Sequence, residues 1–136
     1  MLRSILAVIA GSVVWMAVAL GLDFLLMSLF PHWADSRGRV ESVPVLFLML
    51  SYSTATEVLA GYVTGRVARR REVAHALVLG LLQLTMGAVA TVRMWDTAPA
   101  WWHAALLALV VPATVAGGQW RALHKSRRGV GAAATA

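Results

Sequence analysis

Residues 43–66 read VPVLFLMLSYSTATEVLAGYVTGR, and Glu57 is the one charged side chain in this stretch before the closing Arg66. A membrane-spanning helix needs about 20 mostly apolar residues, because the hydrocarbon core of a bilayer is about 30 Å thick. An apolar run of this length is too long for a strand, and a helix satisfies its own backbone hydrogen bonds in lipid. The stretch therefore predicts a transmembrane helix that carries a buried carboxyl group.

The composition of the whole chain agrees with this prediction. The 136 residues are 60% hydrophobic and 13% charged, and they include no Cys. An ordinary soluble domain is about 45–50% apolar and about 25% charged. The composition therefore excludes a disordered chain, a disulfide scaffold and a soluble enzyme, and it indicates an integral membrane protein.

Three further stretches have the length and apolarity of a span, at about 4–30, 73–94 and 99–120. The stretch at 4–30 begins like a signal peptide, but its apolar run is too long for one. We therefore interpret it as a retained signal-anchor. The fold predicted is all-α, an integral membrane bundle of four transmembrane helices at about 4–30, 43–66, 73–94 and 99–120. It forms a single domain over residues 1–128, followed by a flexible C-terminal tail at 129–136.

The distribution of Lys and Arg predicts how the bundle is oriented. Nine of the twelve lie in the N-terminus, the loop between the second and third helices, and the C-terminal segment; the other three are Arg37, Arg39 and Arg93. Positively charged loops stay in the cytoplasm, so we expect both termini inside. The basic loops should also attract anionic lipids. We expect no nucleic-acid partner, because no aromatic stacking surface accompanies the arginines.

Glycines spaced by four residues predict close helix packing. Gly61 and Gly65 lie on one face of the second helix, and Gly117 lies in a similar pattern with Ala113 on the fourth. Small residues at this spacing let helix backbones approach each other in lipid. The same faces would serve equally well for self-association into a homo-oligomer or for contact with a membrane partner.

Glu57 is the main candidate for a functional residue, because ionisable groups at membrane depth are costly. Its candidate partners at similar depth are His75, Gln83 and Gln119. One interpretation makes Glu57 a proton- or cation-coupling residue. The other makes it a hydrogen-bonded packing residue, and it is preferred because a single carboxyl defines no pathway.

Asp23 and Arg93 lie near the outer ends of the first and third helices, and we expect them to form an ion pair, since either charge alone would be uncompensated. Four other polar groups on this side have ligand types that suit a metal, but their spacing matches no metal motif: His32, Asp35, Asp96 and His103. We therefore expect no metal, no haem and no other cofactor. No nucleophile lies in a catalytic context, so we expect no enzyme activity.

Three stretches from Glu57 onward carry a resemblance to known proteins. They are EVLAGYVTGRVA at 57–68, HALVLG at 75–80, and PAWWH at 99–103, which is followed by Pro112 and Gly117-Gly118. They resemble small bacterial inner-membrane proteins of four helices, a group without an assigned activity. The resemblance implies a multi-pass protein of the bacterial inner membrane. The chain does not resemble the small multidrug exporters, whose membrane carboxylate lies in the first helix.

Two functions remain from the sequence. The preferred one is a non-enzymatic inner-membrane protein, structural or accessory to a partner complex. The alternative is a small transporter or channel subunit that uses Glu57 for coupling. Because four helices from one copy should enclose little volume, the alternative predicts an oligomer, at least a dimer.

Overall fold

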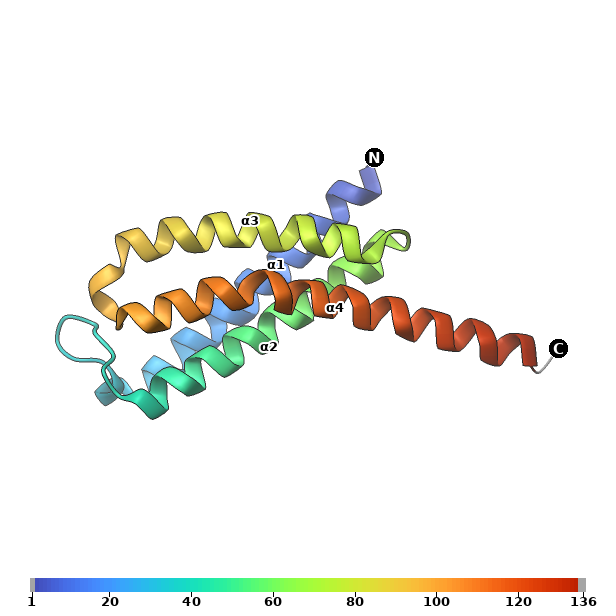
Figure 1. Ribbon diagram of the computed structural model, residues 1–136. Helices are drawn as coiled ribbons and strands as arrows, with labels where there is room; N and C mark the ends of the chain where they lie inside the picture. The colour runs from blue at the N-terminus through green and yellow to red at the C-terminus, as the bar shows by residue number, and fades with distance from the viewer. Residues whose placement is uncertain (1, 135–136) are drawn as a thin grey trace.

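The structure is a computed structural model that describes the backbone of residues 2–134 and the side chains of residues 2–127. Its long helices are α1 (Leu2–Leu29), α2 (Val43–Ala68), α3 (Glu72–Arg93) and α4 (Ala100–Ala134), with short 3-10 turns η1 (Pro31–Trp33) and η2 (Trp95–Thr97) between them (Figure 1). Within residues 2–134 there is no strand. All four long helices are long and apolar enough to cross a membrane, which confirms the predicted all-α fold of four long helices.

The helix boundaries agree with prediction except at the C-terminus. We predicted that the fourth helix ends near residue 120 and that residues 129–136 form a flexible tail, but α4 continues to Ala134. Residues 135–136 lie outside the described residues. Basic residues after Trp120 end the apolar run, yet no helix breaker follows directly, so the helix continues beyond its apolar part.

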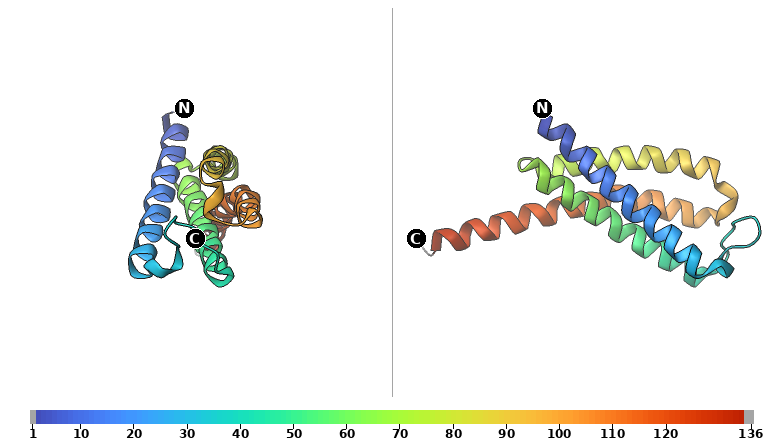
Figure 2. Two further views of the ribbon diagram at one scale, coloured as in Figure 1. Left: turned by 90° about the vertical axis from the view of Figure 1, so that its left-hand side faces the viewer. Right: turned by 180° about the vertical axis from the view of Figure 1, so that it is seen from behind.

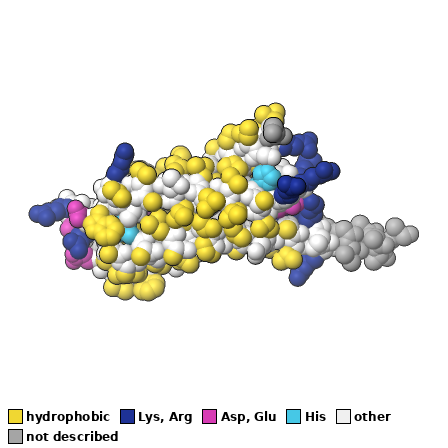
Figure 3. Space-filling view, turned by 45° about the horizontal axis from the view of Figure 1, so that its top comes forward, with side chains coloured by type: hydrophobic (Ala, Val, Ile, Leu, Met, Phe, Trp, Pro, Cys, Tyr) yellow, Lys and Arg dark blue, Asp and Glu magenta, His cyan; other side chains and the backbone are white. Residues whose placement is uncertain are grey.

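The helices form a bundle with two distinct ends. Both termini and the α2–α3 turn lie at one end, which we call the terminal end; residues 30–42 and η2 lie at the other, which we call the loop end (Figure 1). Helix α1 crosses the bundle obliquely, and α4 projects beyond it at the terminal end (Figure 2). Lys and Arg side chains lie at both ends and are more numerous at the terminal end, while the surface between the two ends is largely apolar (Figure 3). This pattern suits a bundle that spans a bilayer.

Helices α2 and α4 come into backbone contact at two glycines. A Cβ atom on Gly61 would overlap the carbonyl group of Thr114, and one on Gly117 would overlap the carbonyl oxygen of Val58. Gly65 also lies at a helix contact, where a Cβ would come 3.2 Å from Glu72 Cβ. These glycines are therefore used in packing within one chain.

A small apolar cluster closes the loop end. Val40, Leu46 and Ala98 are buried together, and Trp102 packs against them while its indole N–H donates to the carbonyl of Leu46 at 3.2 Å. The backbone N–H of Val40 donates to the carbonyl of Thr97 at 2.9 Å. The connection between α1 and α2 is thus fixed against the start of α4.

Asp35 shapes the same connection. Its carboxylate accepts hydrogen bonds from the backbone N–H groups of Arg37 and Arg39, each at 2.8 Å. These bonds, first that from Arg39 and then that from Arg37, lower the pKa of Asp35 below its ordinary value. Asp35 therefore acts as the acceptor of a turn in residues 35–39.

The backbone contacts at Gly61 and Gly117 give a testable prediction. Gly61→Ala and Gly117→Ala should each destabilise the protein by about 1–3 kcal/mol, because the new methyl group meets backbone atoms that cannot turn away. The midpoint of thermal unfolding in detergent measures this effect.

The matched control is Gly21→Ala, because a Cβ on Gly21 in α1 meets nothing within 4 Å. This variant should unfold at the wild-type temperature or above. Equal loss of stability in all three variants would contradict the packing assigned to α2 and α4.

Candidate functional site

Three polar side chains from three helices meet in the middle of the bundle. The hydroxyl of Thr114 on α4 lies 3.1 Å from Glu57 Oε2 on α2 and 3.1 Å from Gln83 Oε1 on α3. It also lies 2.8 Å from the carbonyl oxygen of Val110, one turn earlier in its own helix. The exposed fractions are 5% for Glu57, 2% for Gln83 and 0% for Thr114. We call Glu57, Gln83 and Thr114 the polar cluster.

The contact between α2 and α4 accounts for this meeting. Glu57 lies one turn before Gly61, and the carbonyl of Thr114 rests on Gly61. Residues four apart share a helix face, so the contact that admits the Thr114 backbone also brings its side chain to the carboxyl of Glu57.

Hydrogen-bond counting indicates the chemical state of the polar cluster. A threonine hydroxyl has one proton to donate, yet three acceptor oxygens surround that of Thr114. The array is complete if Glu57 is a neutral carboxylic acid that donates to Thr114, and if the amide of Gln83 presents its NH2 group. Turning the Gln83 amide by 180° exchanges its oxygen and nitrogen atoms and directs the NH2 group at Thr114. This orientation would also give a partner to Nε2, which is otherwise buried without one. The geometry is thus compatible with a protonated Glu57.

A cavity of about 800 Å³ extends from the polar cluster towards the loop end. Its lining is largely apolar and includes five methionines: Met16, Met27, Met49, Met86 and Met94. Cavities of about 300–1,000 Å³ with apolar walls and a few polar groups are typical of small-molecule sites. Unbranched methionine side chains also adapt to ligands of different shape.

Acidic side chains outnumber basic ones in the lining of this cavity. Glu57 and Asp23 contribute carboxyl groups, and no Lys or Arg is among the lining residues in the described part of the chain. Asp23 accepts a hydrogen bond from the phenol of Tyr52 on α2. The aromatic rings of Trp15 and Trp102 also line the cavity. The cavity therefore suits a neutral or positively charged molecule better than an anion.

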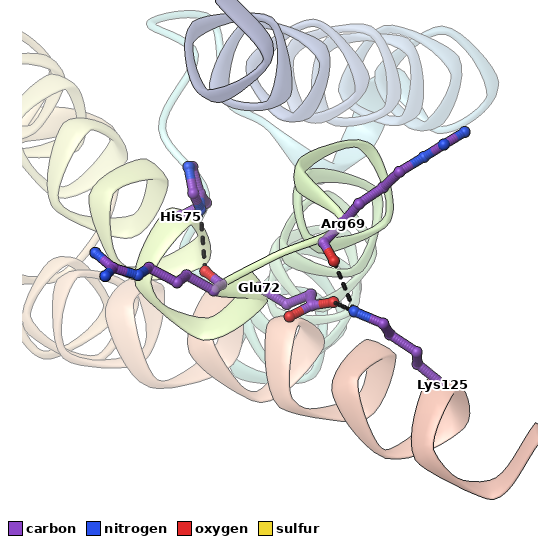
Figure 4. Close-up of polar contacts among 5 residues, drawn as sticks. Arg69, Glu72, His75 and Lys125 are labelled. Carbon is purple, nitrogen blue, oxygen red and sulfur yellow. Dashed lines mark hydrogen bonds and ion pairs between the residues drawn. The ribbon is translucent and has the colours of Figure 1, made fainter. Parts of the chain in front are cut away.

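The structure brings together only part of the predicted polar set. Glu57 and Gln83 meet, whereas Gln119 is exposed and His75 lies at the terminal end. The ring of His75 is turned to its own helix start, where Nδ1 donates to the carbonyl of Arg71 at 3.0 Å (Figure 4). Sequence reasoning missed Thr114, although it lies three residues before Gly117 on the helix face that the glycine marks.

The predicted ion pair between Asp23 and Arg93 is wrong. Asp23 is paired with Tyr52, and Arg93 is exposed at the end of α3. Within residues 2–127 the ion pairs are Arg39–Glu41 and Lys125–Glu72. Asp23 lines the central cavity, whereas Arg93 is not among its lining residues.

His103 lies at the loop end of the cavity. Its ring stacks on Trp95 with centroids 5.4 Å apart and meets the edge of Trp102 at 5.3 Å. The described residues contain no group of three or more His, Cys, Asp or Glu side chains that could hold a metal ion.

Comparison with family models, with curated proteins and with solved structures found no match to this chain. The site is therefore interpreted from its own geometry.

The bridging role of Thr114 gives a prediction. Thr114→Val keeps the shape of the side chain but leaves Glu57 and Gln83 buried without their shared partner, which should cost about 1–3 kcal/mol of unfolding free energy. Thr114→Ser keeps the hydroxyl and should lose less. Chemical or thermal unfolding in detergent measures the difference, and equal stability of the Val and Ser variants would contradict the bridging role.

Proposed function

We propose that the protein is a non-enzymatic, multi-pass membrane protein that binds and transports a lipophilic cation, with Glu57 as its proton- and cation-coupling residue. The observation that carries the proposal is the carboxyl of Glu57 at one end of an apolar cavity of about 800 Å³. The geometry favours this function over a purely structural role, since a packing residue has no need of a cavity beside it.

Electrostatics supports a cation as the ligand. A charged group in a low-dielectric site is costly unless a charge of opposite sign accompanies it. The cavity supplies two carboxyl groups, Asp23 and Glu57, and the aromatic faces of Trp15 and Trp102. An anion would meet no Lys or Arg in this lining, and His103 at the loop end is its one basic side chain among the described residues.

Exchange of a proton for the cation keeps the buried charge constant. In the empty protein a neutral Glu57 donates to Thr114, and no net charge lies in the polar cluster. When a cation enters, Glu57 releases its proton and becomes the counter-ion. Binding of one cation is then linked to release of one proton, which is the basis of coupling.

A single copy has room for the ligand. The cavity of about 800 Å³ is lined by residues of one chain and is partly open at its side. We therefore propose binding within one copy, while the expectation of at least a dimer for the transporter stays a prediction. We also propose that both termini are cytoplasmic, on the basis of the Lys and Arg distribution. A bacterial inner membrane is proposed from the resemblance described above.

The second candidate function is the accessory role in a partner complex. Gly61, Gly65 and Gly117 do not favour it, because they are used within the chain. Ala17 and Gly21 do, because both are exposed four residues apart on α1, where a partner helix could approach closely.

A pair of ions of similar shape and opposite charge tests the proposal. Purified protein should bind tetraphenylphosphonium, and tetraphenylborate should bind at least about tenfold more weakly, because only the cation finds counter-charges. Affinity for the cation should rise with pH, approaching about tenfold per pH unit while the empty Glu57 is protonated, since binding releases its proton. Isothermal titration calorimetry in two buffers of different ionisation enthalpy measures both affinity and proton release.

Glu57→Gln should weaken cation binding by about tenfold or more and should abolish the pH dependence. The matched control is Glu41→Gln, because Glu41 is an exposed acid that pairs with Arg39 outside the cavity. It should behave as wild type. Equal binding of both ions, or no binding of either, would contradict the proposal, and the second result would leave the accessory role.

A further inference from the structure

A second pocket lies at the terminal end, between the last turns of α2 and the part of α4 that faces them. Its volume is about 420 Å³, and its lining residues are Tyr62, Arg66, Arg69, Arg121, His124 and Lys125. We call it the basic pocket. Unlike the central cavity, it has no acidic residue among its lining residues in the described part of the chain.

The charge of Lys125 is already compensated. Its Nζ donates to Glu72 Oε1 at 2.7 Å and to the carbonyl oxygen of Arg69 at 2.6 Å (Figure 4). Glu72 has a side chain that is only 11% exposed, so this pair ties the start of α3 to α4. Lys125 therefore lines the basic pocket, but its charge is balanced by that of Glu72.

The three guanidinium groups of the basic pocket are compensated less closely, since only Arg121 attracts an acidic side chain, Glu72, and it does so at longer range than Lys125. Within residues 2–127, Arg66, Arg69 and Arg121 form no ion pair with a carboxylate. The Nε of Arg121 is buried and has no hydrogen-bond partner. A buried donor without an acceptor is costly, and three like charges around one pocket repel each other. A multivalent oxyanion in the pocket would relieve both costs.

Phosphate is the oxyanion that suits this arrangement best. Guanidinium groups present several N–H donors in a planar fork, which matches the oxygens of a phosphate group. The backbone helps to collect the arginines, because Arg69 takes a left-handed conformation, with φ of 59°, where it ends α2. The chain turns there, so Arg69 lines the same pocket as Arg121 from α4.

The surroundings of the basic pocket indicate that the phosphate belongs to a lipid. Tyr62, Trp120 and His124 form an aromatic group with ring centroids 5.7–6.1 Å apart. Trp120 is 54% exposed and Leu123 is 60% exposed, so apolar surface adjoins the pocket. Trp at the end of a span lies at the level of lipid headgroups. Acyl chains would lie along the apolar surface while the phosphate enters the pocket.

We propose that the basic pocket is a binding site for the phosphate of an anionic phospholipid headgroup, held by Arg66, Arg69 and Arg121. This site is separate from the central cavity, and it does not depend on the function proposed for Glu57. It is also more specific than a general attraction of basic loops to acidic membranes, because it assigns the binding to three arginines and leaves out their neighbour Arg70.

The test measures retention of phosphatidylglycerol and phosphatidylcholine on the full-length protein by native mass spectrometry. Wild type should retain phosphatidylglycerol in preference to phosphatidylcholine. Arg66→Gln and Arg121→Gln should each reduce that retention by about tenfold, because each removes a charge-assisted hydrogen bond. Arg66 is exposed, so its variant should fold normally, which circular dichroism checks.

Two controls separate this site from simpler explanations. Arg70→Gln removes the same charge from the same turn outside the pocket, and it should change retention less than twofold. Glycerol 3-phosphate and inorganic phosphate carry the phosphate without acyl chains, and neither should displace the lipid. An effect of Arg70→Gln equal to that of Arg121→Gln would overturn the pocket in favour of diffuse attraction. Displacement by either soluble phosphate would overturn the lipid as its source.

Discussion

The close contact of α2 with α4 is the constraint on which the rest of the structure depends. Gly61 receives the backbone of Thr114, and Gly117 receives the backbone of Val58, so two helices meet without side chains between them. In lipid the hydrophobic effect does not drive helices together, because the lipid tails are as apolar as the helix surface. Close van der Waals contact of this kind therefore supplies much of the packing energy. It also sets the chemistry, because the same approach places the hydroxyl of Thr114 against the carboxyl of Glu57.

The two ends of the bundle provide different environments around this contact. Towards the loop end lies the apolar cavity of about 800 Å³, whose charged lining groups are carboxyls. At the terminal end lies the basic pocket of about 420 Å³, whose arginines form no ion pair within the described residues. The two pockets thus differ in the sign of the charged side chains that line them. A cation in the first site and a lipid phosphate in the second are the ligands that each environment would stabilise.

The sequence predicted position along each helix better than direction around it. Four spans followed from apolar length, and Glu57 with Gln83 followed from polarity at depth. Gln119 and Arg93 have suitable depths, but both are exposed. Whether a side chain is buried or exposed depends on how its helix is rotated about its own axis, and the neighbouring helices determine that rotation. Thr114 was missed because threonine is common in membrane helices. Its contact with Glu57 also depends on the packing of its backbone against Gly61, which the sequence of one helix does not reveal. The length of α4 was missed because charge ends a span without ending a helix.

The central claim is that Glu57 is a neutral acid in the empty protein and gives up its proton when a cation binds. Infrared difference spectroscopy measures this directly, because a protonated carboxylic acid has a carbonyl band distinct from that of a carboxylate. At neutral pH the empty protein should show an acid band that is absent from Glu57→Gln, and tetraphenylphosphonium should remove it. A Glu57 that is already a carboxylate when empty, or an acid band that the cation leaves unchanged, would contradict the account.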